Sequence, residues 1–254
     1  MDIKEIRNRA REAARGSCRV CAVCDGTACA GEVPGMGGAG AGLSFRRNVE
    51  ALAALRLKTR LVHQVRHPEM SVEILGLTLS LPLLIAPIGG LAFNLGGALS
   101  EADYQEAVVA GATRAGILAG TPDGAPPEVM ETGLACARRH GGRALAFIKP
   151  WAVSEIIQKM EMAAEAGCRV VACDLDSIGL ITLRQMGRPA YAKDARELAE
   201  IAGAAHRLGL KFVLKGLMSR EDALAGLEAG VDGLVVSNHG GRVLDGTPGT
   251  AEVL

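Results

Sequence analysis

The sequence predicts an α/β protein of the (β/α)8 TIM-barrel type, with about six of the eight strands present in this chain. Six short apolar runs recur along the 254 residues, and alanine-rich helical patterns lie between several of them. Continuous apolar runs alternating with helices are typical of a parallel sheet that helices cover. An open doubly wound sheet is the competing architecture. Its glycine-rich turn has only a weak echo in IGGLAFNLGG, residues 88–97.

The first residues, MDIKEIRNRAREAARG, predict a short amphipathic helix that ends at Gly16. They are charged throughout and lack the apolar core of a signal peptide. Residues 74–100 carry no charge, but prolines and glycines interrupt them, which a membrane-spanning helix tolerates poorly. A buried strand and a glycine-rich loop fit this stretch better. We therefore expect a cytoplasmic protein without a membrane span.

The segment CRVCAVCDGTAC brings four of the seven cysteines together in the sequence: Cys18, Cys21, Cys24 and Cys29. Gaps of two residues suit thiolate coordination of zinc or of an iron–sulfur cluster. The alternative is a set of reduced thiols in a glycine-rich loop over residues 16–42. Of the remaining cysteines, Cys168 and Cys173 flank or lie in an apolar run, where free thiols behave as small hydrophobes. We expect residues 1–43 to form an N-terminal helix and a Cys/Gly-rich segment, and residues 44–254 to form the barrel.

The barrel region begins with a helix predicted from Ser44, whose hydroxyl can cap it, through Leu55. The predicted strands lie within residues 81–87, 116–120, 143–148, 168–174, 210–215 and 233–237, and helical patterns cover 154–166, 194–208 and 219–229. The last residues, TPGTAEVL, resemble the first turns of a helix with no strand after it. We expect the natural polypeptide to continue into the missing C-terminal strands. Two open sheet edges predict association, so a homo-oligomer is expected.

Charged side chains follow three of the predicted strands. Asp174 and Asp176 share parity with Val170 and Ala172, Lys215 ends the next strand, and Ser237 and His239 share parity with Val235. Strand side chains alternate between faces, and in a barrel of this type reactive groups lie at the carboxyl ends of the strands. These residues are therefore expected to surround one cavity.

Each of these residues also has a simpler interpretation. Lys215 can extend to solvent from a strand end, the aspartates can cap a helix, and His239 can be a loop histidine. A second enzyme hypothesis is an aldolase-like lyase, with a Schiff base on Lys215 or a metal on the aspartates. A third is a non-catalytic truncated barrel with a Cys-rich metal-binding segment. The occurrence of these groups at successive strand ends favours a catalytic site.

The stretch VVSNHGGRVLD, residues 235–245, resembles the signature of the FMN-dependent 2-hydroxy-acid oxidising family, which includes glycolate oxidase and lactate oxidase. The likeness extends from about Phe45 onward and includes LPLLIAP at 81–87 and the whole of 215–242. That family is a (β/α) barrel with flavin at its mouth. The resemblance implies an FMN-dependent oxidase or dehydrogenase that converts a 2-hydroxy acid to a 2-oxo acid.

The resemblance also implies residue roles. His239 is the base that takes a proton from the substrate, Asp176 orients its imidazole, and Arg242 binds the substrate carboxylate. Lys215 lies near the flavin N1 and O2 edge, where negative charge collects on reduction. The other positions implied for cofactor contacts are Ala86, Pro87, Ile88, Gly89, Gly120, Thr121, Asp174 and Ser237.

The sequence departs from the family pattern at several positions. The N-terminal tyrosine has no counterpart in CAGEVPGMGG, and Lys149 occupies the position of the tyrosine expected after the third strand. The Pro-Arg pair expected after the fourth strand is missing from DLDSIGL. Arg242 is left as the usual carboxylate contact, and Lys149 can partly replace the others. The segment that grips the flavin phosphate, expected after strands seven and eight, is absent from this chain.

The composition limits the partners. Lys plus Arg and Asp plus Glu each total 28, and aromatic residues make up only 3%. Zero formal charge offers no electrostatic argument for nucleic acid, and few aromatics exclude extensive base stacking. The expected partner is a small-molecule carboxylate substrate. If the four clustered cysteines hold an iron–sulfur cluster, electrons would leave by that route rather than to oxygen.

Overall fold

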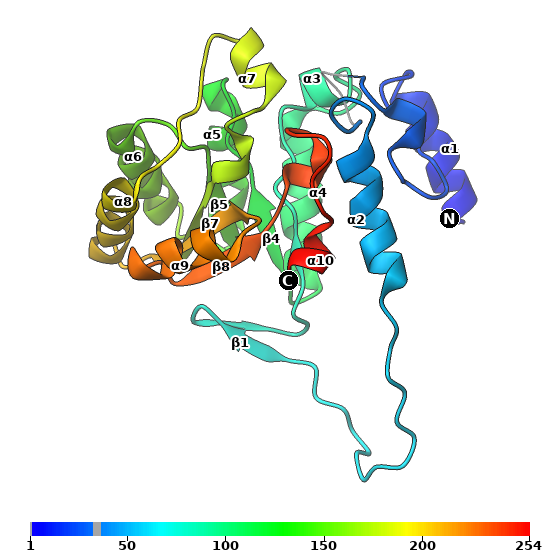
Figure 1. Ribbon diagram of the computed structural model, residues 1–254, viewed down its shortest axis with the longest axis horizontal. Helices are drawn as coiled ribbons and strands as arrows, with labels where there is room; N and C mark the ends of the chain where they lie inside the picture. The colour runs from blue at the N-terminus through cyan, green and yellow to red at the C-terminus, as the bar shows by residue number, and fades with distance from the viewer. Residues whose placement is uncertain (1, 33–36) are drawn as a thin grey trace.

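Six parallel strands form one curved sheet in the computed structural model, which describes residues 2–32 and 37–254 (Figure 1). The strands are β3 (Leu84–Ile85), β4 (Leu118–Thr121), β5 (Ala144–Ile148), β6 (Val170–Asp174), β7 (Lys211–Leu217) and β8 (Gly233–Val236). They lie in sequence order across the sheet, and each neighbouring pair is parallel. Every apolar run predicted as a strand overlaps one, and β4 and β7 extend past the predicted runs by one and two residues. The six-stranded, barrel-type sheet is thus confirmed.

Helices connect the strands and cover the outer face of the sheet (Figure 1). In chain order the helices are α1 (Ile3–Ala13), α2 (Leu43–Ala54), α3 (Leu91–Asn94), α4 (Glu101–Arg114), α5 (Pro127–Arg139), α6 (Val153–Glu165), α7 (Ile181–Gln185), α8 (Ala195–Arg207), α9 (Arg220–Glu228) and α10 (Thr250–Val253), of which α1 and α2 precede the sheet and α10 follows it. Short 3-10 turns are η1 (Thr27–Cys29), η2 (Leu175–Ser177) and η3 (His239–Gly241). Local sequence determines where several helices begin. At α8, the Asp194 side chain accepts a hydrogen bond from the backbone N–H of Glu197, and the Glu197 side chain accepts one from the backbone N–H of Asp194, which forms a capping box. None of the helices in the described ranges is long and apolar enough to cross a bilayer.

Ser44 does not cap α2, contrary to the sequence prediction. Gly42 precedes the helix in the left-handed conformation, and Ser44 is buried inside its first turn. The Ser44 hydroxyl donates instead to the carbonyl of Leu244, at 3.0 Å. A contact between residues 200 positions apart therefore replaces the local cap.

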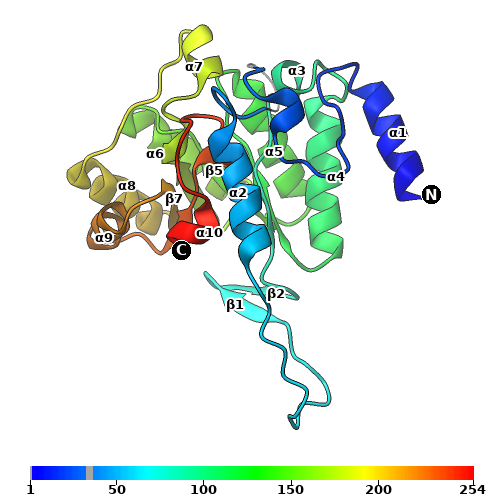
Figure 2. The same ribbon diagram turned by 45° about the vertical axis from the view of Figure 1, so that its right-hand side comes forward.

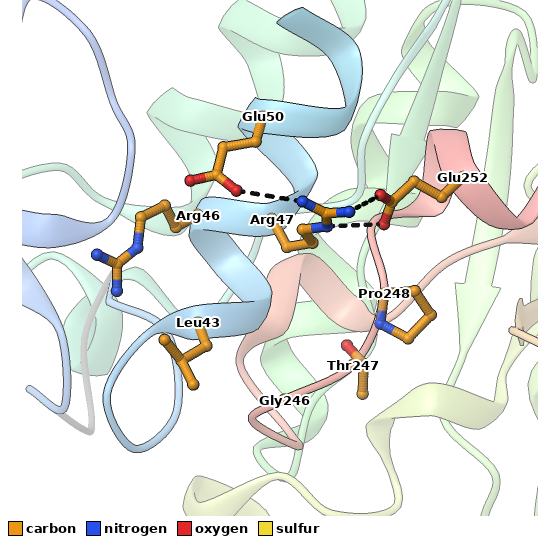
Figure 3. Close-up of a pocket in the computed structure, with 8 residues that line it drawn as sticks. All are labelled: Leu43, Arg46, Arg47, Glu50, Gly246, Thr247, Pro248 and Glu252. Carbon is orange, nitrogen blue, oxygen red and sulfur yellow. Dashed lines mark hydrogen bonds and ion pairs between the residues drawn. The ribbon is translucent and has the colours of Figure 1, made fainter. Parts of the chain in front are cut away.

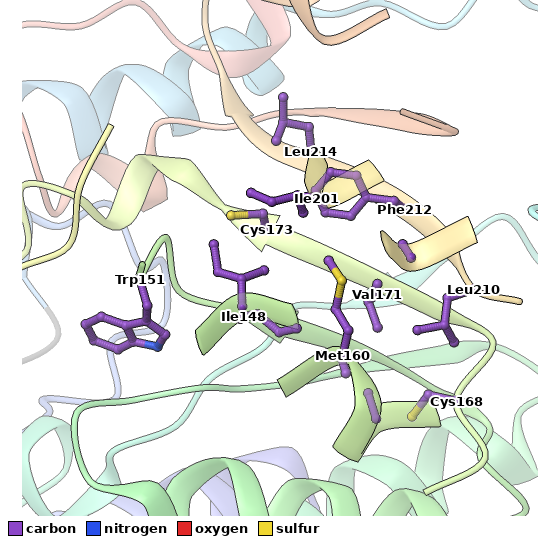
Figure 4. Packing of buried hydrophobic residues seen from close by; sticks show 14 of the residues in the cluster. Ile148, Trp151, Met160, Cys168, Val171, Cys173, Ile201, Leu210, Phe212 and Leu214 are labelled. Carbon is purple, nitrogen blue, oxygen red and sulfur yellow. The ribbon is translucent and has the colours of Figure 1, made fainter. Parts of the chain in front are cut away.

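The two faces of the sheet follow the period of two in the strands. On the outer face, Val171 and Cys173 of β6 pack with Met160 of α6 and Ile201 of α8 (Figure 4). Cys168 is buried in the same cluster, so the prediction that the core thiols act as small hydrophobes is confirmed.

On the inner face, Val170, Ala172 and Val213 pack against a hairpin that the sequence did not predict. This hairpin pairs β1 (Val72–Ile74) with β2 (Leu77–Leu79) in antiparallel register. Its strands are three residues long, too short for a periodic signal. Because the hairpin fills the inner face near the start of the strands, the polar residues at their carboxyl ends face a separate space.

Residues 55–71 contain no helix or strand, and they extend away from the body of the molecule (Figures 1 and 2). Leu57 and Leu61 in this arm are 95% and 92% exposed. Together with the open edges of β3 and β8, the arm leaves apolar surface and unpaired backbone groups for association.

Candidate active site

The carboxyl ends of β6, β7 and β8 bring four ionisable side chains together. Asp174, the last residue of β6, is paired in register with Lys215 of β7. The Lys215 ammonium donates to Asp174 Oδ1 at 2.5 Å and to both carboxylate oxygens of Asp176 at 2.7 Å. His239 follows β8 and reaches the same carboxylates. The sequence prediction that these groups surround one cavity agrees with this geometry.

His239 is held by Asp176 at two points. Its Nδ1 lies 2.9 Å from Asp176 Oδ1, and its backbone N–H donates to Oδ2 at 2.9 Å. The Ser237 hydroxyl donates to the same Oδ2, at 2.5 Å. When Nδ1 carries the proton that Asp176 accepts, Nε2 presents a lone pair. The arrangement orients a base.

The turn that carries His239 requires an uncommon backbone. His239 has a φ of 55°, and Gly240 and Gly241 follow at 67° and 74°. A Cβ on Gly241 would lie 2.4 Å from the backbone nitrogen of Phe45. Glycine at this position therefore lets η3 approach the start of α2 closely, and the imidazole turns back toward β6.

A bulge in β7 positions Lys215. The ladder between β7 and β8 shifts between Lys215 and Leu217, and Gly216 has a φ of 110°. A Cβ on Gly216 would lie 2.5 Å from the backbone nitrogen of Asp176. The glycine thus allows the backbones after β6 and in β7 to touch, which keeps the ammonium between two carboxylates.

Opposite charges decide the protonation of this cluster. Burial alone would raise the pKa of Asp174, but the charges on Lys149, His239 and Lys215 hold the pKa well below its usual value. Burial alone would lower the pKa of Lys215, but Asp174 and Asp176 outweigh it and the pKa is raised. Both aspartate and lysine are therefore charged at neutral pH.

The charged cluster opens into a pocket of about 400 Å³. Of the predicted site residues, the pocket lining includes Ala86, Pro87, Ile88, Gly89, Lys149, Asp174, Lys215, Ser237, His239 and Arg242. Gly120 and Thr121 are buried in β4 and do not line it, and Asp176 lies behind His239. Cys18, Cys21, Cys24 and Cys29 line the same pocket.

Arg242 enters the pocket from the loop after η3. Its Nη2 donates to Asn94 Oδ1 at 2.9 Å, and Asn94 in turn donates to the carbonyl of Gly89 at 2.7 Å. Burial lowers the pKa of Arg242, yet a guanidinium remains charged at neutral pH. A half-buried planar cation that lines a pocket suits a carboxylate ligand.

Sequence reasoning missed polar residues that line the pocket, namely Arg19, Asn94, Asp123 and Thr182. The Asp123 carboxylate accepts from the backbone N–H of Lys149 at 3.0 Å and from Trp151 Nε1 at 2.7 Å. It also accepts from Lys159 at 2.8 Å. The available signal was position: Asp123 follows β4 by two residues, at the same end of the sheet as the other charged groups.

The predicted metal site at the four clustered cysteines is not supported. Within residues 2–32 and 37–254, ligand atoms spaced for a metal are found at Asp174, Asp176 and His239, and no group of three cysteine sulfurs meets that spacing. All seven cysteines are free. At Asp174 and Asp176, the Lys215 ammonium donates to both carboxylates and already balances their negative charge, as a metal ion would.

The geometry also argues against the aldolase-like alternative. A Schiff base forms from a neutral amine. Burial alone would lower the pKa of Lys215, but the charges of Asp174 and Asp176 outweigh this effect and raise the pKa. Protonated at neutral pH, this amine is a poor nucleophile. Its position suits electrostatic stabilisation of negative charge instead.

A second hollow, of about 500 Å³, lies between α2 and residues 246–248 (Figure 3). Arg47 lines it and bonds to Glu252 of α10 and to Glu50 of α2. None of the predicted site residues lines this hollow. Its charged pairs join the first and last helices of the barrel region.

The sheet of parallel strands, with catalytic-type residues at the carboxyl ends, defines an α/β-barrel protein. Solved structures show the same fold. A mandelate oxidase superposes with a TM-score of 0.73 over 98% of this chain and 73% of its own, at 21% identity. A lactate oxidase from Pediococcus acidilactici gives a TM-score of 0.71 over 100% of this chain and 71% of its own, at 20% identity.

The family follows from the sequence comparison. The family model of FMN-dependent dehydrogenases matches residues 35–188 and 182–254, and the chain belongs to this family. An L-lactate oxidase from Lacticaseibacillus rhamnosus is 27% identical over 240 residues, which is 84% of this chain and 63% of that protein. A peroxisomal (S)-2-hydroxyacid oxidase from Arabidopsis thaliana is 27% identical over 252 residues, 86% of this chain and 66% of that protein. The chain thus spans less than two thirds of the length of these relatives, and the family resemblance seen in the sequence is confirmed.

Proposed function

We propose that the protein oxidises a 2-hydroxy acid to the 2-oxo acid with FMN as the electron acceptor. The observation that carries this proposal is the His239–Asp176 pair, which opens into the same pocket as the guanidinium of Arg242. A base beside a carboxylate-binding cation is what removal of a proton from a 2-hydroxy acid requires. Membership of the FMN-dependent dehydrogenase family supports the cofactor.

His239 is proposed as the base. Its Nε2 takes a proton from the substrate, and Asp176 stabilises the imidazolium that results. FMN, when bound, accepts two electrons from the substrate. Asp176 also receives hydrogen bonds from Ser237 and Lys215, so the carboxylate keeps its orientation as the imidazole gains charge.

Arg242 is proposed as the primary contact for the substrate carboxylate. Asn94 holds one of its nitrogens at 2.9 Å, which limits the rotation of the guanidinium. Lys149 lines the pocket too, but it is 9% exposed and donates to Asp174 at 2.5 Å. We therefore assign Lys149 a secondary contact that strengthens the positive potential around the carboxylate.

The residues present fit FMN in their chemistry. Lys215 supplies a half-buried cation, and cations near a flavin ring stabilise the negative charge that reduction places on it. Backbone and apolar groups of residues 86–89 line the same pocket and suit a flat ring. Asp174 and Ser237 are proposed as polar contacts from β6 and from the end of β8. Gly120 and Thr121 do not line the pocket, so we propose that they support the residues that contact FMN from behind.

Anaerobic mixing tests the proposal. The full-length protein, carrying FMN, is mixed with glycolate, L-lactate or mandelate, and the flavin absorbance is followed. We expect at least one of these acids to bleach the flavin, and the corresponding 2-oxo acid to form in equal amount. A protein that binds FMN but is not bleached by any 2-hydroxy acid would lack the proposed activity.

The division into residues 1–43 and 44–254, the homo-oligomer and the cytoplasmic location remain proposals. The exposed arm at residues 55–71 supports association. Light scattering of the full-length protein measures its mass in solution. A monomer would contradict the homo-oligomer.

A further inference from the structure

Four thiols stand at the mouth of the candidate active site. Cys18, Cys21, Cys24 and Cys29 all line the pocket that Lys215 and His239 line. The remaining cysteines, Cys136, Cys168 and Cys173, are buried outside it. None of the four takes part in the proposed removal of a proton from the substrate.

The segment that carries these thiols is anchored to the catalytic turn. The backbone N–H of Ala39 donates to the carbonyl of Gly241 at 2.8 Å, two residues after His239. The Asp245 carboxylate accepts from the backbone N–H groups of Ala41 and Ser44, at 2.8 and 3.0 Å. Gly31 donates to the carbonyl of Gly38 at 3.0 Å, which connects the anchored part to the thiols. The thiols are therefore part of the wall of the site.

Cys24 is the most accessible of the four and has the other thiols as neighbours. Its side chain is exposed, whereas Cys18, Cys21 and Cys29 are half-buried. Partial burial raises the pKa of Cys24, and negative charge on Cys18 and Cys21 raises it further. Cys18, Cys21 and Cys24 follow one another at intervals of three residues and line one pocket, so two of these thiols lie within reach of a disulfide once the loop rearranges.

We propose that Cys24 forms a redox-active disulfide with Cys18 or Cys21, and that this disulfide takes electrons from the reduced flavin. This inference rests on the proposed binding of FMN in the pocket. The disulfide accepts two electrons and two protons, its S–S bond breaks, and two thiols form. The flavin loses the same two electrons and returns to its oxidised state.

An external disulfide compound then reoxidises the pair by thiol–disulfide exchange. The exposed Cys24 attacks one sulfur of that compound, and the mixed disulfide is resolved by its partner cysteine. One S–S bond is regenerated in the protein and two thiols leave on the external compound. A 2-hydroxy acid would thereby reduce an external disulfide.

A metal on the same thiols is the less favoured occupant. No three of these sulfurs, in the part of the chain that the structure describes, have ligand spacing. A disulfide needs only two sulfurs in contact, which a small rearrangement of neighbouring residues in a loop provides.

An anaerobic dithionite titration tests the proposal without any hydroxy acid. The full-length, FMN-loaded protein is first oxidised with a small disulfide, freed of it, and titrated until the flavin bleaches. We expect the wild type to take two electron pairs per flavin and Cys24→Ser to take one. Cys168→Ala, which removes a buried thiol outside the pocket, is the matched control and takes two pairs. Alkylation with iodoacetamide and peptide mass analysis locates the thiols that appear, with Cys24 among them.

A wild type that takes one electron pair per flavin, with its disulfide intact after bleaching, would overturn the proposal. So would a purified protein in which bound metal protects all four thiols from alkylation. Dithionite bypasses His239 and Arg242. If the titration succeeds while every 2-hydroxy acid fails to bleach the flavin, the proposed substrate is wrong and the disulfide stands.

Discussion

His239 Nδ1 lies 2.9 Å from Asp176 Oδ1, although the two residues are 63 positions apart in the chain. They follow β8 and β6, and the strand between these two, β7, supplies Lys215 to the same carboxylate. Three successive strands thus place a base, its orienting carboxylate and a cation at one end of the sheet.

Replacing His239 by Gln should remove the base and leave the cofactor. Loss of a positioned general base costs about 10²- to 10⁴-fold in rate. We expect the rate of anaerobic flavin reduction by substrate to fall by such a factor while the FMN content per protein stays at the wild-type level. Loss of FMN along with activity would make His239 a structural residue.

Asp176→Asn tests the orientation of the imidazole. An amide can donate to Nδ1 and favour the tautomer whose proton lies on Nε2, which blocks proton removal there. In a comparable His–Asp pair of another enzyme class this change costs about 10⁴-fold in rate. We expect a loss of similar order in flavin reduction. A variant with near wild-type rate would show that Asp176 does not control the tautomer.

Lys215→Met tests both the charge and the packing of the cluster. Removing one partner of a buried ion pair costs about 3–5 kcal/mol, because buried charge is left uncompensated. Asp174 and Asp176 would then repel each other. We expect a lower free energy of unfolding and a lower reduction potential of bound FMN, measured by denaturant unfolding and by a dye-equilibrium titration. The control variant Lys215→Arg keeps the positive charge and should preserve most of the reduction potential of bound FMN. An unchanged reduction potential in Lys215→Met would show that the charge of Lys215 does not stabilise the reduced flavin.

Gly216→Ala tests the bulge in β7. Any L residue is strained at a φ of 110°, and this Cβ would also meet the Asp176 backbone at 2.5 Å. Gly209→Ala is the matched control, because its φ is 72° and nothing lies within 4 Å of the added Cβ. Backbone strain alone costs about 1–3 kcal/mol. We expect both variants to lose stability and only Gly216→Ala to lose flavin reduction activity as well; equal activities would rule out a role for the contact.

Asp174 should make the protein sensitive to acid. Burial would raise its pKa, but Lys149, His239 and Lys215 hold the pKa well below its usual value in the folded state. The unfolded chain has the ordinary pKa of about 3.9, so it binds a proton first as the pH falls. The contribution of Asp174 to stability is therefore complete above about pH 5, and it is lost progressively as the pH falls from there toward the lowered pKa of the folded state.

Urea unfolding between pH 7 and pH 3 measures this effect. The free energy of unfolding of the wild type should fall as the pH is lowered through that window. In Asp174→Asn, which has no proton to bind, the decline should be smaller. Parallel curves for the two proteins would show that Asp174 does not contribute to the acid sensitivity.

Much of the fold could be predicted from the sequence because it is local. Apolar runs of five to seven residues predicted the six strands, and alternation along β6 placed Asp174 on the same face as Val170 and Ala172. Residues 235–245 carried the family resemblance because the turn after β8 needs its glycines and its histidine at adjacent positions. The β1–β2 hairpin could not be predicted in this way, since its strands are three residues long.

The sequence by itself determined the order of the strands, their alternating faces and the residue types at their carboxyl ends. Only the tertiary structure decided which groups meet: Lys149 with Asp174, Asn94 with Arg242, and Ser44 with the loop after η3. It also decided that the cysteine segment lies over the pocket. Such contacts join residues 25 to 200 positions apart, and no period along the chain encodes them. They depend on how the packed strands and turns bring distant side chains within bonding distance.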